Sequence, residues 1–105
     1  AKALELLLTG DWVGAEEAHR IGLVNRLAEP EHLAAETAAF ARVIADHAPV
    51  TVRMIKRATY QSANTDLRTA LDLVSSHFAV VAATEDAAEA LQAMKDKRTP
   101  QYRGR

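Results

Sequence analysis

The chain has 105 residues, of which 49% are hydrophobic and 26% charged, and its formal net charge is -1. This length fits one domain, and the composition is that of a folded chain, too apolar for intrinsic disorder. The small net charge argues against a nucleic-acid-binding or membrane-surface protein, and no apolar run approaches the length of a membrane span.

The first part of the chain is predicted to form two short helices bounded by glycines. Residues 1–8 read as the end of a helix that Gly10 closes, because glycine tolerates a left-handed backbone. A start in mid-helix, without a capping residue or an initiating Met, favours a truncated start. Gly14 is an acceptable N-cap for a second helix over 15–21. Residues 23–27 are then expected to be a brief extended stretch.

Two prolines and a polar turn divide the middle of the chain into three helices. Pro30 suits a first helical position, and apolar residues recur at helical spacing from there to His47. Pro49 breaks that helix and can start the next. Residues 62–66 are a turn whose short polar side chains can cap a long helix, whose apolar stripe runs over 67–81.

Thr84 is predicted to cap the last helix, and Pro100 marks its stop. The chain is therefore predicted to be all-α, without internal repeats or low-complexity segments. Its apolar stripes are broad for so few helices, so part of that surface is expected to serve a partner subunit or a further domain.

No residue pattern in the chain points to catalysis or metal binding. Its adjacent carboxylates, Glu16 with Glu17 and Glu85 with Asp86, fall in first turns of predicted helices, where the helix dipole favours negative charge. The four histidines show no i, i+4 pair, and there is no cysteine. The missing cysteine is compatible with a reducing compartment, and we expect a cytoplasmic protein. Trp12 is expected to anchor a loop on the core rather than to line a ligand pocket.

The C-terminal end is locally basic. Its cations complement a helix C-terminus, which is the structural interpretation, but they can also bind the phosphates of a ligand such as coenzyme A. From residue 95 onward they stand against Asp96 alone: Lys95, Lys97, Arg98, Arg103 and Arg105.

Three segments carry a resemblance to a known family. They are ELLLTG at 5–10, AEEAHRIGLVNRL at 15–27 and TEDAAEALQAMKDKRTPQY at 84–102. In this order and spacing they resemble the C-terminal part of the crotonase superfamily, the enoyl-CoA hydratases and isomerases. The resemblance implies the C-terminal helical trimerisation domain of the crotonase fold, with about five helices and without the N-terminal ββα spiral core. Residues 1–27 would be the end of that core with a connecting helix, and residues 28–105 the helical oligomerisation domain.

The resemblance also implies a function. The parent enzyme would hydrate 2-enoyl-CoA thioesters, with coenzyme A as part of the substrate and no other cofactor. This segment would supply contacts of a homo-oligomer, a trimer or hexamer, and Lys97 and Phe78 would reach coenzyme A bound to a neighbouring subunit. Phe78 also lies on the apolar stripe, where a core or interface role is as well supported. The acid/base carboxylates and oxyanion-hole amides of the family lie upstream of this segment, so the chain alone is expected to be inactive.

Four positions depart from the family pattern, and other functions stay open. The departures are Ala90 for Gly, Met94 for Phe, Asp96 for Glu, and Tyr102 for Phe or Trp. Another crotonase-type reaction on an acyl-CoA, such as isomerisation, thioester hydrolysis or ring closure, is one alternative. A free-standing helical interaction module, suggested by the broad apolar stripes, is another. Binding of nucleic acid or membrane is not expected.

Overall fold

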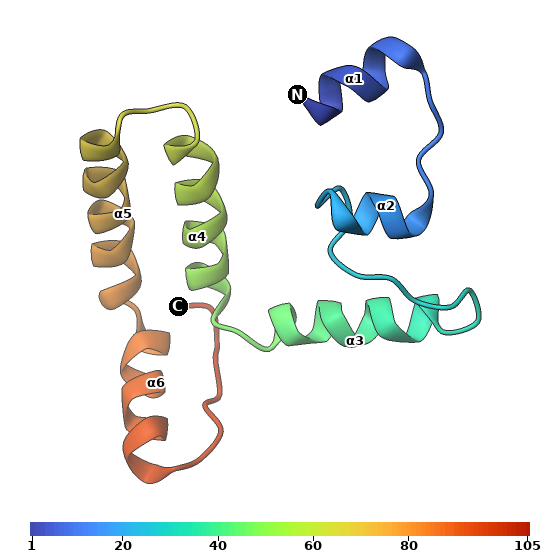
Figure 1. Ribbon diagram of the computed structural model, residues 1–105. Coiled ribbons are helices and arrows are strands. Elements are labelled where there is room, and N and C mark those ends of the chain that lie inside the picture. Colours follow the sequence, from blue (N-terminus) through green and yellow to red (C-terminus); the bar gives the residue numbers. More distant parts are fainter. The chain divides into compact units, whose positions relative to one another are not determined.

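The computed structural model describes residues 1–105 as six helices joined by turns, without a strand (Figure 1). The all-α prediction is confirmed, with a helix number close to the five expected. The chain divides into two compact units, residues 1–38 and residues 39–105, and the division falls within one helix. No helix is long and apolar enough to cross a membrane.

The first unit begins with two short helices that end as the glycines predict. Helix α1 (Lys2–Thr9) is closed by Gly10, whose φ is 71° and whose amide donates to the Leu6 carbonyl at 3.0 Å. Helix α2 (Ala15–Arg20) has Gly14 as its N-cap and ends one residue before the predicted bound. The left-handed backbone at Gly10 is the conformation in which glycine lacks the steric penalty of other residues.

The segment after α2 is bent rather than extended. The amides of Leu23 and Val24 both donate to the carbonyl of Ala18, at 2.8 and 3.3 Å, so the chain folds back onto the end of the helix. The expected extended stretch at 23–27 is therefore wrong at its start, because α2 offers its free C-terminal carbonyls to these amides.

Pro30 lies outside the third helix, which is a second correction. Helix α3 (Leu33–Ala45) starts three residues later. The His32 amide donates to the Glu29 carbonyl at 2.9 Å, which makes Pro30 the second residue of a turn. The fixed φ of proline suits that turn position as well as it suits a helix start.

The second unit is built on an antiparallel helix pair. Helix α4 (Pro49–Ser62) starts at its predicted proline and packs along α5 (Leu67–Ala82) (Figure 1). The carboxylate of Asp66 caps α5 by accepting from the amides of Arg68 and Thr69, at 3.1 and 3.2 Å. Helix α6 (Glu85–Asp96) follows α5 directly, and Thr84 Oγ1 caps it by accepting from the Ala87 amide at 3.1 Å.

The tail, residues 97–105 after α6, runs back along the second unit to the start of α4 (Figure 1). There Gly104, with φ 77°, lies close to the Pro49 ring: a Cβ at Gly104 would be 3.6 Å from Pro49 Cγ. The tail therefore joins the end of α6 to the first turn of α4 within this unit.

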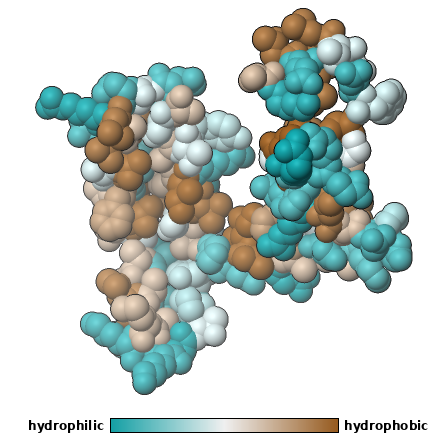
Figure 2. Space-filling view, in the orientation of Figure 1, coloured by the Kyte–Doolittle hydropathy of each residue, from teal (hydrophilic) through white to brown (hydrophobic).

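The chain buries almost no apolar side chains of its own. Its buried apolar residues are three alanines, Ala18, Ala48 and Ala93. Larger apolar side chains stay at the surface, as the brown areas over α4 and α5 show (Figure 2). Trp12 is fully exposed, so the prediction that it anchors a loop on a core of this chain is wrong. Burial of apolar area is the main driving force of folding. In this chain most of the large apolar side chains remain exposed and available for contact with other protein surfaces.

Candidate functional site

The turn that ends α6 contains Lys97, one of the two predicted ligand contacts. Lys97 has φ 54° and is the one non-glycine residue of the chain with a positive φ. Its amide donates to the Met94 carbonyl at 3.3 Å, and the Arg98 amide donates to the Ala93 carbonyl at 3.0 Å. This pair of bonds is the Schellman motif, which satisfies the last carbonyls of a helix and prefers glycine at the left-handed position.

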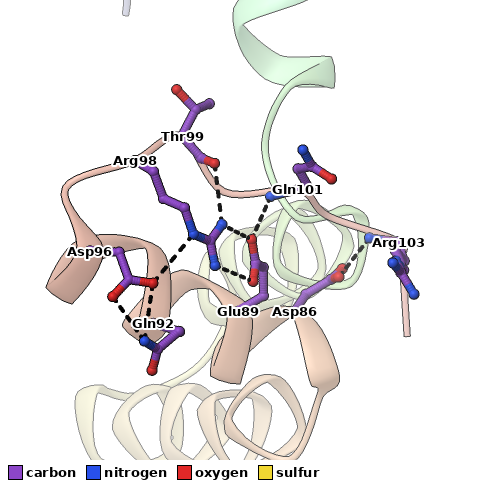
Figure 3. A network of polar contacts seen from close by, with 8 residues as sticks. All are labelled: Asp86, Glu89, Gln92, Asp96, Arg98, Thr99, Gln101 and Arg103. Carbon is purple, nitrogen blue, oxygen red and sulfur yellow. Dashed lines mark hydrogen bonds and ion pairs between the residues drawn. The ribbon is translucent and has the colours of Figure 1, made fainter.

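A bidentate ion pair between Arg98 and Glu89 links this turn back to α6 (Figure 3). Both guanidinium nitrogens Nη1 and Nη2 of Arg98 donate to the carboxylate of Glu89, with 2.9 Å between Nη2 and Oε2. The Gln101 amide donates to Glu89 Oε1 at 2.8 Å, and Asp96 Oδ2 lies 3.5 Å from Arg98 Nε. The hydrogen bonds from Arg98 and the Gln101 amide lower the pKa of Glu89 to about 2, and the Glu89 carboxylate raises the pKa of Arg98.

The buried carboxylate of Asp86 binds the end of the tail. Its side chain is 2% exposed, and its two carboxylate oxygens accept from the amides of Arg103 and Gly104, at 2.7 and 2.8 Å. The Asp86 amide donates to the Arg105 carbonyl at 3.0 Å. Glu85 adds an exposed ion pair to Arg105 at 2.9 Å. The tail is thus bonded to the first turn of α6 through both side-chain and main-chain atoms.

The predicted dipole role of Glu85 and Asp86 is incomplete, because the structure also gives both of them partners in the tail. Asp86 and Glu89 are three residues apart, which places both on one face of a helix. That spacing and the basic tail that follows are visible in the sequence, but neither indicates which tail groups these acids meet.

The ammonium of Lys97 is exposed and makes no hydrogen bond or ion pair. Two of its basic neighbours differ in this respect, because Arg98 and Arg105 are neutralised by Glu89 and Glu85. Lys97 therefore presents an uncompensated positive charge on a fixed turn, which is a suitable contact for a phosphate.

Phe78, the second predicted contact, lies on α5 with 70% of its surface exposed. It lines an apolar groove of about 690 Å³ between α4, α5 and α6, whose wall also includes Ile55, Leu91, Met94 and Tyr102. Lys97 is not part of that wall. Within this chain the structure does not bring Phe78 and Lys97 into one pocket.

Nothing in the chain forms a metal centre: no group of three His, Asp or Glu side chains is close enough to hold an ion. The candidate site therefore consists of a cationic turn and an apolar groove. Such a pair of surfaces can bind a ligand or a partner.

The low pKa of Glu89 predicts a pH-dependent contribution to stability. The pKa is about 2 in the folded chain against an ordinary value of 4.5, so the contribution is complete above about pH 5 and is lost as the pH falls toward 2. We expect Glu89→Gln to lower the urea midpoint at pH 7 and to lower it much less at pH 2, where the Glu89 carboxyl becomes protonated in the folded chain as well. The measurement is urea unfolding of both proteins at the two pH values, and an equal difference at both would contradict the assignment.

Comparisons with known proteins match the whole chain to one family. The family described as enoyl-CoA hydratase/isomerase matches residues 1–105. The short-chain-enoyl-CoA hydratase of Clostridioides difficile is 42% identical over 91 residues, which is 87% of this chain and 59% of that protein. The (E)-benzylidenesuccinyl-CoA hydratase of Thauera aromatica is 36% identical and covers 99% of this chain, and the match spans 41% of that protein.

The structural comparison agrees with the sequence comparison. The crystal structure of an enoyl-CoA hydratase from Bacillus anthracis superposes with a TM-score of 0.96 at 36% identity. It covers 100% of this chain, which in turn spans 41% of that structure. The chain therefore matches a part, between about two fifths and three fifths, of each of these proteins.

Proposed function

Because this chain belongs to the enoyl-CoA hydratase/isomerase family, we propose that it is the C-terminal part of an enzyme that adds water to 2-enoyl-CoA thioesters. Support comes from relatives named hydratases, at 42% and 36% identity. Those names favour hydration over the isomerisation that the family also includes. Coenzyme A would enter as part of the substrate, no further cofactor is proposed, and the proposed location is the cytoplasm.

We propose that Lys97 contacts the phosphates of coenzyme A and that this is the segment's share in substrate binding. The observation that carries the proposal is the unpaired ammonium of Lys97 on a turn that is held on both sides. Phe78 is proposed to add an apolar contact from its groove, since it exposes 70% of its surface. A base or pantetheine chain stacked on such a ring would be desolvated together with it.

The wide apolar surface supports a second role, the assembly of a homo-oligomer. Obligate interfaces resemble a domain core cut in half, and α4, α5 and α6 expose side chains of that kind around the groove. We propose that copies of the full protein associate through this surface, as a trimer or a hexamer.

Hydration itself is proposed to depend on groups outside this chain. General acid/base catalysis needs carboxylates that are free to exchange protons with substrate and water. Asp86 and Glu89 are instead engaged with tail amides and Arg98, and Glu17 is paired with Arg20 at 2.6 Å. We expect the pure 105-residue polypeptide to show no hydratase turnover, and a rate proportional to its concentration across independent preparations would contradict this.

The test of the binding role is Lys97→Ala in the natural polypeptide. We expect kcat/KM for 2-butenoyl-CoA to fall about tenfold, which corresponds to the loss of one charge-assisted contact worth about 1.4 kcal/mol. The same acyl group on pantetheine, which lacks phosphates, is expected to react as in the parent. Lys95→Ala removes a cation two residues away that also lacks an ion pair, and it serves as the control. Equal losses in the two variants, or no loss in either, would refute a specific role of Lys97.

A further inference from the structure

Lys97 occupies a backbone position that this chain elsewhere gives to glycine. Gly10 ends α1 with φ 71° and Gly22 follows α2 with φ 76°, whereas Lys97 ends α6 with φ 54°. A side chain with a Cβ is disfavoured in this conformation and persists there only when its surroundings determine the backbone. Something other than the intrinsic preference of lysine must therefore hold the turn.

The turn is held by the side chains of the two residues that flank Lys97 in the sequence, Asp96 and Arg98, which Figure 3 shows with their partners. On one side, Asp96 accepts from Gln92 Nε2 with 3.0 Å to each carboxylate oxygen. On the other side, the Arg98 guanidinium is bound by both oxygens of Glu89, nine residues earlier. Lys97 thus lies between two residues that are each tied back to α6, while its own side chain is tied to nothing.

We propose that Glu89 and Arg98 are positioning residues for Lys97: their ion pair holds the left-handed turn from which Lys97 reaches the phosphates of coenzyme A. The inference rests on the binding role of Lys97 proposed above. Neither Glu89 nor Arg98 touches the ligand in this proposal. Their effect is preorganisation, since a ligand that meets a fixed turn does not have to order it.

The geometry separates this pair from the other contacts of the tail. Asp86 and Glu85 bind residues 103–105, beyond Pro100, and leave the turn itself untouched. Glu89 binds Arg98, next to Lys97, and also the Gln101 amide at 2.8 Å. Residues 103–105 and the turn at Lys97 are therefore held by different acids, and the two sets of contacts can be removed separately.

The test compares Glu89→Gln with Glu85→Gln in the natural polypeptide, each alone and combined with Lys97→Ala. The readout is the ratio of kcat/KM for 2-butenoyl-CoA to that for 2-butenoyl-pantetheine, which a loss of folded protein does not move. We expect Glu89→Gln to lower this ratio three- to tenfold and Glu85→Gln to leave it unchanged. In the presence of Lys97→Ala, Glu89→Gln should have no further effect on the ratio, because positioning acts only through the lysine.

A second variant, Lys97→Gly, separates the backbone from the side chain. Glycine is favoured at this φ, so we expect a higher thermal midpoint than for Lys97→Ala together with the same loss of the ratio. An unchanged ratio in Glu89→Gln, with a lowered ratio in Lys97→Ala, would overturn the positioning role and leave the binding role intact. If the ratio does not change in Lys97→Ala either, both proposals fail. A further additive loss in the double variant would also overturn positioning, because Glu89 would then act independently of Lys97.

Discussion

Replacing Asp86 by alanine is expected to lower the free energy of unfolding by roughly 3 kcal/mol, the largest effect of a single substitution that we predict in this chain. The carboxylate is 2% exposed and accepts from two tail amides at 2.7 and 2.8 Å. Loss of the acceptor leaves each part-buried donor unsatisfied, at about 1–3 kcal/mol per group, unless the tail detaches and gains water. Either response undoes the contact of residues 103–105 with α6.

The measurement is chemical denaturation of the natural polypeptide, with Asp72→Ala as the matched control. Asp72 lies on the exposed side of α5, so its replacement is expected to change the free energy of unfolding by less than about 0.5 kcal/mol. Asp86→Asn keeps one acceptor oxygen and should fall between the two. Equal stabilities of the Asp86→Ala and Asp72→Ala proteins would show that the tail contributes nothing to the fold.

Self-association of the isolated 105-residue polypeptide is the second large effect that we expect. Its buried apolar residues are three alanines, while side chains such as Leu91 and Met94 are 59% and 70% exposed. Contiguous apolar patches beyond roughly 600 Å² are rare on soluble monomers, because water disfavours them. We expect strong binding of an apolar dye and a mass above 11.4 kDa by sedimentation at micromolar concentration.

Polar substitution in the groove gives this prediction its control. Leu91→Gln combined with Met94→Gln should reduce dye binding and association of the isolated polypeptide. In the natural polypeptide the same pair should weaken the proposed homo-oligomer. The substitutions should therefore raise the solubility of the isolated polypeptide and lower that of the natural one. A monomeric isolated chain with a cooperative unfolding transition and no dye binding would contradict an apolar surface that needs a partner.

Local patterns in the sequence predicted most of the helix bounds. Gly10 and Gly14 bound α1 and α2, Pro49 starts α4 and Thr84 caps α6. Each of these assignments rests on bonds between residues no more than four apart, which the sequence displays directly. The same locality explains the error at Pro30, because a turn and a first helical turn place the same demand on proline.

The family was also indicated by the sequence, since three motifs in the right order and spacing are retained over residues 5–102. The roles of Phe78 and Lys97, by contrast, stay proposals, because both rest on surfaces whose partners lie outside the chain. Trp12 shows the same limit: its aromatic ring predicted an anchor on a core, and this chain supplies no core at that position.

The sequence by itself determined that this chain is helical, where most of its helices begin and end, and which family its motifs belong to. Only the tertiary structure decided what the acids of α6 do. Glu89 meets Arg98 nine residues later and the Gln101 amide twelve later, and Asp86 meets amides seventeen and eighteen residues away. Contacts of that range depend on the path of the tail back along the helix, which no local pattern encodes, and that path is what sets Lys97 on a fixed turn.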